Sequence, residues 1–193
     1  MKKEETVRIS KKIWGPKAWN LLHSFSIHPK KEITKEEAHG YYILYKTFVY
    51  MIPCTICKIH YKDMIELYSP IMENEITRSN LKKWVWKIHN LVNKRLGKKQ
   101  IEYKEAMKIQ EKIENQDIFY FINIRFFSFD DKKCCLFEYD QIYHFFYYFG
   151  KLYPDEKVRK KLTQLVESET FSNLSSPREF KDWYLKTYQS WQS

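Results

Sequence analysis

Two cysteines separated by two residues, Cys54 and Cys57, are the strongest chemical feature of the sequence. At this spacing the two sulfurs can close a disulfide, and they react readily when one of them ionises. Pro53 favours a helix that begins at the pair, and a helix N-terminus stabilises a thiolate through its free N–H groups and its dipole. The pattern therefore predicts a dithiol that exchanges electrons.

A zinc site is the competing interpretation of the same cysteines. Cys54, Cys57 and His60 are residue types that zinc accepts, and either His23 or His89 could complete a set of four ligands. No second Cys-x-x-Cys pair supplies the other half of a standard site. We therefore favour redox chemistry over zinc, and also over a third interpretation in which both cysteines are inert buried thiols.

Aromatic, imidazole and amide side chains follow two helical lines. At about 100° per residue, Trp86, His89 and Asn93 lie within about 60° of one another on a helix, and basic residues follow them. Trp19 and His23 form a second such line, one turn apart. Each residue alone fits a structural histidine or a core tryptophan. Together they suit a large planar ligand with a phosphate tail.

Helices must position these side chains, because 4 glycines and 6 prolines in 193 residues argue against many short strands joined by tight turns. Pro16 indicates the first turn of a helix, Thr34 and Glu37 form a capping box, and Gly97 is a C-terminal stop. We expect an antiparallel bundle whose four helices cover residues 14–27, 34–53, 53–68 and 79–97.

Composition limits the class of protein. An aromatic content of 18% is too high for a disordered chain, and no apolar run is long enough to span a membrane. The N-terminal residues are charged and show no export signal. A net charge of +10 permits nucleic-acid binding, but Lys and Arg are scattered among acidic residues, so we favour a solvated surface.

The two halves of the chain share a weak repeat at an offset of about 100 residues. The matches pair residues 25–31 with 127–133, 44–53 with 145–154, and 81–84 with 180–183. In this register Asp155 and Val158 replace Cys54 and Cys57, so the second copy would keep a core and lack the dithiol. Chance similarity between amphipathic helices is the alternative explanation.

These motifs resemble the Erv/ALR family of FAD-dependent sulfhydryl oxidases, most closely its members from large cytoplasmic DNA viruses. The likeness spans about Ile13 to Lys108 and rests on three motifs in the family's order. They are Trp14-Gly15-Pro16-Lys17-Ala18-Trp19 with Leu22-His23, Pro53-Cys54-Thr55-Ile56-Cys57 with His60, and His89-Asn90 with Val92-Asn93 and Leu96-Gly97-Lys98. The resemblance implies an all-α fold, with a four-helix-bundle Erv-like domain that holds FAD.

The resemblance also implies roles for individual residues. Cys57 would lie next to the flavin, and Cys54 would exchange disulfides with the substrate. A substrate dithiol would reduce the pair, Cys57 would pass two electrons to the flavin, and oxygen would take them to give hydrogen peroxide. The residues implied to bind FAD are Gly15, Trp19, His23, His89, Asn90, Val92, Asn93, Lys94, Lys98 and Tyr103.

The sequence departs from the family in its other cysteines. The structural cysteine that many relatives carry just before the His-Asn motif is absent, and residues 1–12 hold no shuttle dithiol. Cys134 and Cys135 are adjacent, and a disulfide between them would be strained, so we do not assign them a shuttle role. We expect the electrons to come directly from a separate thioredoxin-like or small dithiol protein.

Some relatives pack a degenerate Erv-like domain on the active one. By this resemblance residues 1–114 form the catalytic FAD-binding domain, and residues 115–193 form a second, degenerate Erv-like helical unit. We expect an internal pseudo-dimer, with a homodimer as the alternative. Molecular oxygen is the expected acceptor, and neither nucleic-acid binding nor membrane insertion is expected. The viral resemblance implies the host cytoplasm, or the virion, as the location.

Overall fold

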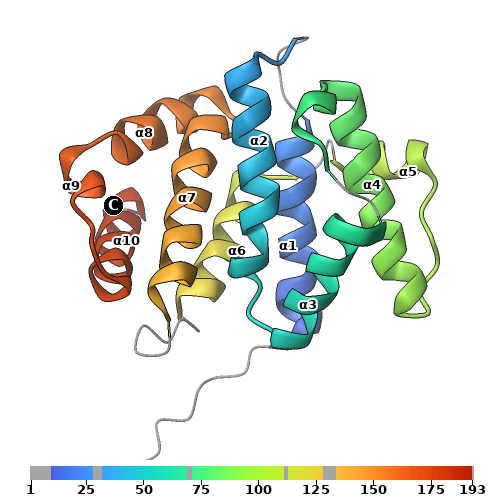
Figure 1. Cartoon of the computed structure of the whole chain (residues 1–193), viewed down its shortest axis with the longest axis horizontal. Helices are drawn as coiled ribbons and strands as arrows, with labels where there is room; N and C mark the ends of the chain where they lie inside the picture. Colours follow the sequence, from blue (N-terminus) through green and yellow to red (C-terminus); the bar gives the residue numbers. More distant parts are fainter. Residues whose placement is uncertain (1–9, 28–31, 69–70, 111–112, 128–133, 193) are drawn as a thin grey trace, which may run out of the picture.

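The computed structural model describes residues 10–27, 32–68, 71–110, 113–127 and 134–192, and within these ranges the chain forms helices and no strand (Figure 1). The all-α prediction is therefore confirmed. The α-helices are α1 (Lys11–Ser26), α2 (Lys35–Thr47), α3 (Thr55–Asp63), α4 (Arg78–Arg95), α5 (Tyr103–Gln110), α6 (Asn115–Phe127), α7 (Leu136–Leu152), α8 (Glu156–Val166), α9 (Glu169–Ser172) and α10 (Pro177–Gln192). Shorter turns of other helical types are η1 (Phe48–Met51), η2 (Met64–Tyr68) and η3 (Glu73–Glu75).

Local capping explains where the helices of the first half begin and end. The predicted box is present at α2: the Glu37 N–H donates to Thr34 Oγ1 over 3.2 Å, and the Thr34 N–H donates to Glu37 Oε2 over 2.9 Å. At the end of α4, Gly97 takes a positive φ of 66°, which only glycine adopts without strain. The Lys98 N–H then donates to the Asn93 carbonyl over 2.8 Å, which satisfies an open carbonyl of the last turn.

Two predicted helix boundaries were wrong. The first helix begins at Lys11, because Ser10 caps it and accepts a hydrogen bond from the Lys12 N–H over 3.3 Å. Pro16 therefore lies in the second turn, where the N–H that it lacks would have bonded to Lys12. The third helix is also not uniform, since α3 begins at Thr55 and passes into the π-helical η2.

The helices of both halves share one core. Helix α1 packs on α4 and α6, and α2 packs on α7, so the first half is joined to the second along two helix pairs. The Tyr45 hydroxyl donates to the Leu22 carbonyl over 2.8 Å, and the Tyr61 hydroxyl donates to the Tyr45 carbonyl over 2.9 Å. Figure 1 shows α1 and α2 at the centre, with α3, α4 and α5 on one side and α7 to α10 on the other.

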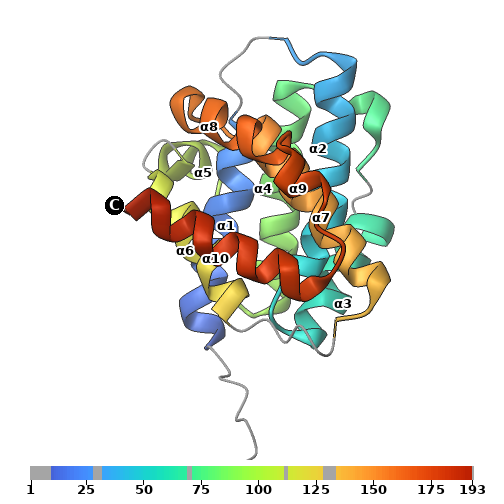
Figure 2. The ribbon, with the colours of Figure 1, turned by 90° about the vertical axis from the view of Figure 1, so that its left-hand side faces the viewer.

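The second half is built around aromatic side chains. Figure 2 shows α10 crossing the molecule, and its Tyr184 ring stacks on Phe126 of α6 with 4.0 Å between the ring centroids. Phe180, also on α10, meets Phe146 of α7 edge to face at 5.2 Å. Burial of these large rings accounts for the aromatic composition of residues 115–193.

The order of elements in the second half follows the proposed repeat. Asp155 caps α8, and its carboxylate accepts the Val158 N–H over 2.9 Å, as Cys54 Sγ accepts the Cys57 N–H over 3.3 Å at the start of α3. The two caps differ by 101 positions, as the repeat requires. Most of the match to residues 127–133 lies outside the described residues, and the duplication stays a prediction.

No helix in the described part of the chain is long and apolar enough to cross a membrane.

The close contact of α7 with α8 gives a stability prediction. A Cβ added at Gly150 would lie 3.0 Å from both methyl carbons of Val166 and 3.1 Å from the Leu162 carbonyl oxygen. Gly150→Val should therefore lower the free energy of unfolding by about 1–3 kcal/mol, because the packed neighbours must move. Urea denaturation measures the change. Gly15→Ala is the control, since a Cβ there meets no atom within 4 Å; equal stability of both variants would contradict this packing.

Candidate active site

The two cysteines of the dithiol sit at the start of α3, as their spacing predicts. Cys54 is the N-cap residue, and its sulfur accepts the backbone N–H of Cys57 over 3.3 Å. Both are free thiols and both are partly exposed, so the structure presents the reduced pair. The capping bond holds the two residues one helical turn apart with Cys54 outside the helix and Cys57 in its first turn.

The two sulfurs have different acidities. Burial opposes ionisation of Cys54, but hydrogen bonds from the Cys57 thiol and N–H, together with the positive charge of Lys11, outweigh it and lower the pKa of Cys54. Burial, followed by the neighbouring Cys54 sulfur, raises the pKa of Cys57 to about 11. The surroundings of the reduced pair therefore favour negative charge on Cys54 over Cys57.

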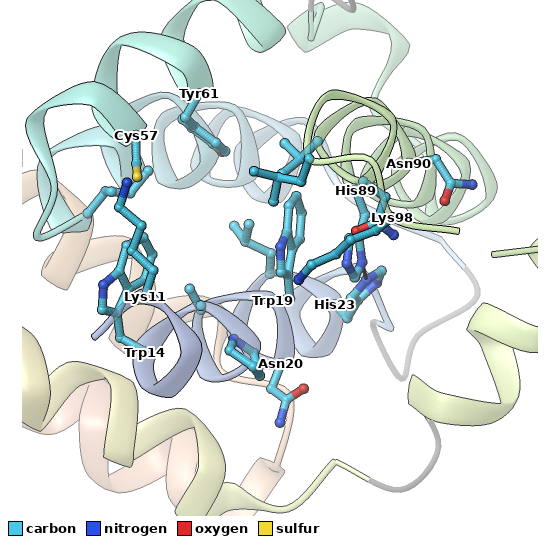
Figure 3. A pocket seen from close by; sticks show the side chains of 18 of the residues that line it. Lys11, Trp14, Trp19, Asn20, His23, Cys57, Tyr61, His89, Asn90 and Lys98 are labelled. Atoms are coloured by element: carbon cyan, nitrogen blue, oxygen red, sulfur yellow. Dashed lines mark hydrogen bonds between the residues drawn. The ribbon is translucent and has the colours of Figure 1, made fainter. Parts of the chain in front are cut away.

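A cavity of about 760 Å³ opens beside Cys57, and Figure 3 shows Cys57 and Lys11 at one end with His23 and His89 at the other. This volume is in the range of cofactor sites. The cavity lies between α1, α3 and α4. Among the residues predicted to bind the ligand or to react with it, those that line the cavity are Gly15, Trp19, His23, Cys57, His89, Asn90, Val92, Asn93 and Lys98.

Three other predicted residues do not line the cavity. Cys54 is not among the residues that line the cavity, and it is partly exposed. Lys94 is exposed on α4. The Tyr103 ring packs edge to face on Trp86, with 5.6 Å between the centroids, and so supports a wall residue.

The two histidines predicted from the helical lines meet at one end of the cavity. His23 Nε2 and His89 Nδ1 share a hydrogen bond of 2.8 Å, and the Trp19 ring stacks on His89 with 4.0 Å between centroids and 6° between planes. Burial lowers the pKa of His23 to about 3, helped by His89, and lowers the pKa of His89 to about 4, helped by Lys98. Both rings are neutral at pH 7 and offer flat, polar faces.

Asn90 holds the chain that returns after α4. Its side-chain amide donates to the Ile101 carbonyl over 2.8 Å, and its oxygen accepts the Ile101 N–H over 2.9 Å. The Trp86 indole N–H donates to the same carbonyl over 2.7 Å. The amide of Asn90 is therefore occupied by the backbone, and its contribution to the cavity is to position this wall.

The charge of the cavity wall is positive. Lys11, Lys12, Arg95 and Lys98 contribute cations, and none of the described residues that line the cavity carries a carboxylate. An anionic ligand matches this wall. With the flat rings of Trp19 and the histidines, the residues fit a planar ring system joined to phosphates.

The ligands suggested for zinc do not converge. Within the described ranges no three His, Cys, Asp or Glu side chains gather as a metal site. His60 lies at the rim of the cavity, where its Nε2 contacts the guanidinium of Arg95. The zinc hypothesis therefore gains no support from the geometry of Cys54, Cys57 and His60.

The second cysteine pair lies beside the start of α7. Cys135 caps this helix, since its sulfur accepts the Glu138 N–H over 3.5 Å, and Glu138 in turn accepts from Lys58 Nζ over 2.6 Å. Burial, followed by the charge of Glu138, raises the pKa of Cys134 to about 11. Cys134 and Cys135 are free thiols, and nothing in their geometry assigns them a shuttle role.

Several wall residues were missed from the sequence. Lys11, Trp14 and Asn20 of α1 line the cavity, as do Arg95 and Ile101. Lys11 and Asn20 are surface-type residues whose place depends on how α1 meets α3 and α4, so no local pattern marks them. Trp14 belongs to the Trp-Gly-Pro motif noted above, so that motif could have marked Trp14 as a cavity residue.

The fold is helical and carries a dithiol at a helix N-terminus, beside a cavity that suits a planar anion. These features define the class of helical thiol redox proteins. The chain belongs to the Erv1 / Alr family, whose model matches residues 16–114. Residues 115–193 lie outside that match. No solved structure matches the chain.

Curated relatives come from viruses and plants. A probable FAD-linked sulfhydryl oxidase of Acanthamoeba polyphaga mimivirus is 35% identical over 99 residues, which are 51% of this chain and 69% of that protein. An FAD-linked sulfhydryl oxidase of African swine fever virus is 33% identical over 101 residues, 51% of this chain and 80% of the relative. An FAD-linked sulfhydryl oxidase of rice (Oryza sativa subsp. japonica) is 25% identical over 97 residues, which are 50% of this chain and 48% of the rice protein.

The neutral histidines predict an acid-sensitive fold. His23 and His89 have pKa values below the usual 6.5, so below pH 6.5 the unfolded chain binds more protons than the folded chain. The free energy of unfolding therefore falls as the pH drops below 6.5. Each histidine contributes a slope of up to about 1.4 kcal/mol per pH unit. Urea unfolding between pH 7 and pH 4.5 measures it.

His89→Gln should reduce this slope, and His39→Gln is the control, because His39 is an exposed histidine of α2 outside the cavity. A slope unchanged in His89→Gln would show that the buried pair does not control acid stability.

Proposed function

We propose that this chain is an FAD-dependent sulfhydryl oxidase that oxidises protein dithiols through Cys54 and Cys57 and passes the electrons to molecular oxygen, giving hydrogen peroxide. The observation that carries the proposal is that Cys57, and not Cys54, lines a cation-walled cavity of about 760 Å³. One cysteine thus lines a ligand site and the other does not, which is the arrangement that an electron relay needs.

Family membership and the FAD-linked viral and plant relatives support FAD as the ligand. The flat faces of Trp19, His23 and His89 suit its rings, and the Lys98 ammonium suits its phosphates. Asn90 would act by holding the wall at Ile101. The remaining residues proposed to surround FAD are Gly15, Val92 and Asn93, with Lys94 and Tyr103 as accessories outside the wall.

The chemistry of the pair follows from which cysteine lines the cavity. A substrate thiolate attacks Cys54 Sγ of the oxidised pair, a substrate–Cys54 disulfide forms, and the Cys54–Cys57 bond breaks with its electron pair on Cys57. The second substrate thiol loses its proton and attacks the first substrate sulfur, which releases Cys54 as a thiolate. Bound FAD would accept the two electrons and deliver them to oxygen.

The high pKa of Cys57 is compatible with its role as the leaving sulfur. Burial is the largest cause of that pKa, and the next two causes are the hydrogen bond and the charge of the Cys54 sulfur. Both of the latter disappear when Cys54 is bound to the substrate. Cys57 is therefore more acidic in the mixed disulfide than in the reduced pair, at the step where it must carry negative charge.

We also propose that residues 1–114 form the catalytic domain and residues 115–193 a degenerate copy. The matching caps at Cys54 and Asp155 support this, as do the equivalent pairs in which α1 meets α6 and α2 meets α7. An internal pseudo-dimer would make the chain a monomer. Sedimentation that shows an obligate homodimer joined away from the second unit would contradict the proposal.

The proposed substrate is a thioredoxin-like or small dithiol protein, and the partial exposure of Cys54 supports direct exchange with such a partner. The proposed location is the host cytoplasm or the virion, which rests on the viral relatives. Fractionation of infected cells, with detection of the chain in purified particles, tests the location.

The first test of the function combines a spectrum with oxygen uptake. Protein purified without added cofactor should be yellow and should consume oxygen with dithiothreitol, with one hydrogen peroxide formed per disulfide. Cys57→Ser should keep the colour and lower the uptake by about a hundredfold or more, because the electrons lose their route to the cavity. A colourless protein, or full activity in Cys57→Ser, would contradict the proposal.

The matched control is the double variant Cys134→Ser, Cys135→Ser. It removes the other cysteine pair, which lies beside α7 and not at the cavity. Its oxygen uptake with dithiothreitol should stay at the wild-type rate, and loss of that uptake would mean that the second pair takes part in the relay.

A further inference from the structure

Lys11 occupies an unusual place for a cation. It is the first residue of α1, and the first turn of this helix holds no acidic residue. A helix N-terminus carries partial positive charge, so a lysine there gains nothing from its own helix. An anionic partner outside the helix would offset this repulsion.

The candidate partner is the dithiol. Figure 3 shows the Lys11 side chain reaching from α1 across the end of the cavity toward the sulfur of Cys57. The backbone that carries it is fixed, because Ser10 caps α1 and Trp14 is buried one turn further on. The long side chain itself is exposed, so its ammonium stays charged while it extends toward the pair.

We infer that Lys11 is a catalytic residue of the dithiol exchange: its ammonium lies against the sulfurs of Cys54 and Cys57 and stabilises the thiolate on whichever of them leaves. This inference rests on the proposed function, in which each sulfur leaves once. Cys57 takes the electron pair when the substrate attacks Cys54, and Cys54 takes it when the substrate disulfide is released. A cation that reaches both sulfurs lowers the barrier of both steps.

The pKa shifts of Lys11 and of the two thiols both agree with an interaction between them. Interaction with Cys57 and then with Cys54 raises the pKa of Lys11, and Lys11 in turn acts to lower the pKa of each thiol. A lysine that stays charged cannot be the base that removes the substrate proton. Its contribution is a fixed positive charge.

The other charged groups around the pair have partners elsewhere. On α3, Lys58 donates to Glu138 over 2.6 Å, and His60 contacts Arg95 of α4. Lys12, the neighbour of Lys11 on α1, lines the cavity but does not shift the pKa of either thiol. Lys12 is therefore the matched control for loss of one positive charge.

The test is the pH dependence of alkylation in the reduced protein, which needs no activity of the flavin. Protein with its flavin as purified is reduced under nitrogen, treated with iodoacetamide between pH 5 and pH 10, and each cysteine is quantified by fragment mass spectrometry. Lys11→Gln should slow labelling of Cys54 at pH 7 by about three- to tenfold and move its profile to higher pH, because the thiolate loses a cation.

Lys12→Gln and Lys11→Arg should follow the wild-type profile. Cys134 and Cys135 are internal controls, since Lys11 is not among the main groups that shift the pKa of Cys134. Faster labelling of both cysteines in a variant would indicate that the variant has lost structure. Wild-type protein at 1 M salt gives a second measurement that needs no variant: screening of the ammonium should slow labelling of Cys54.

Equal profiles for wild type and Lys11→Gln, or an equal shift in Lys12→Gln, would overturn the inference. These results leave the proposed function intact if Cys57→Ser has lost its oxygen uptake. Conversely, full oxygen uptake in Cys57→Ser would overturn the oxidase, whatever the alkylation profiles show.

Discussion

The hydrogen bond from the Cys57 N–H to the Cys54 sulfur is the interaction on which the site depends. It begins α3, it holds the two cysteines at neighbouring positions of the first helical turn, and it stabilises negative charge on Cys54. Because Cys54 is the cap and Cys57 lies in the first turn, the two sulfurs face different surroundings. One bond therefore fixes both the start of the helix and the different places of the two cysteines.

The cavity depends on how neighbouring helices meet that cap. Ser10 starts α1 early enough to bring Lys11 to the dithiol, and Asn90 fixes the return of the chain after α4. Asp155, which the proposed repeat aligns with Cys54, caps α8 with a carboxylate in place of a sulfur. A helix cap tolerates either residue, since both accept the N–H, but only the cysteine supports redox chemistry.

Local rules were enough to predict the four helices within residues 14–97 and the dithiol, because capping and turn residues act over a few positions. The capping box at Thr34 and the glycine stop at Gly97 are examples. The cap at Ser10 was missed because two lysines follow it, and they give no apolar pattern that would mark the start of the helix. Pro16 was taken as a first-turn residue, which placed the predicted start too late. The approach of Lys11 to the sulfurs and of Asn90 to Ile101 depends on packing between helices, which no local pattern contains.

The central claim is that Cys57 is the sulfur that passes electrons into the cavity, and anaerobic reduction of the bound flavin tests it most directly. With a small dithiol in a stopped-flow instrument, the visible flavin band of the wild type should bleach by two electrons, and Cys57→Ser should keep its band over the same period. A Cys57→Ser protein whose flavin bleaches at the wild-type rate would contradict the account, because the electrons would then enter the cavity without Cys57.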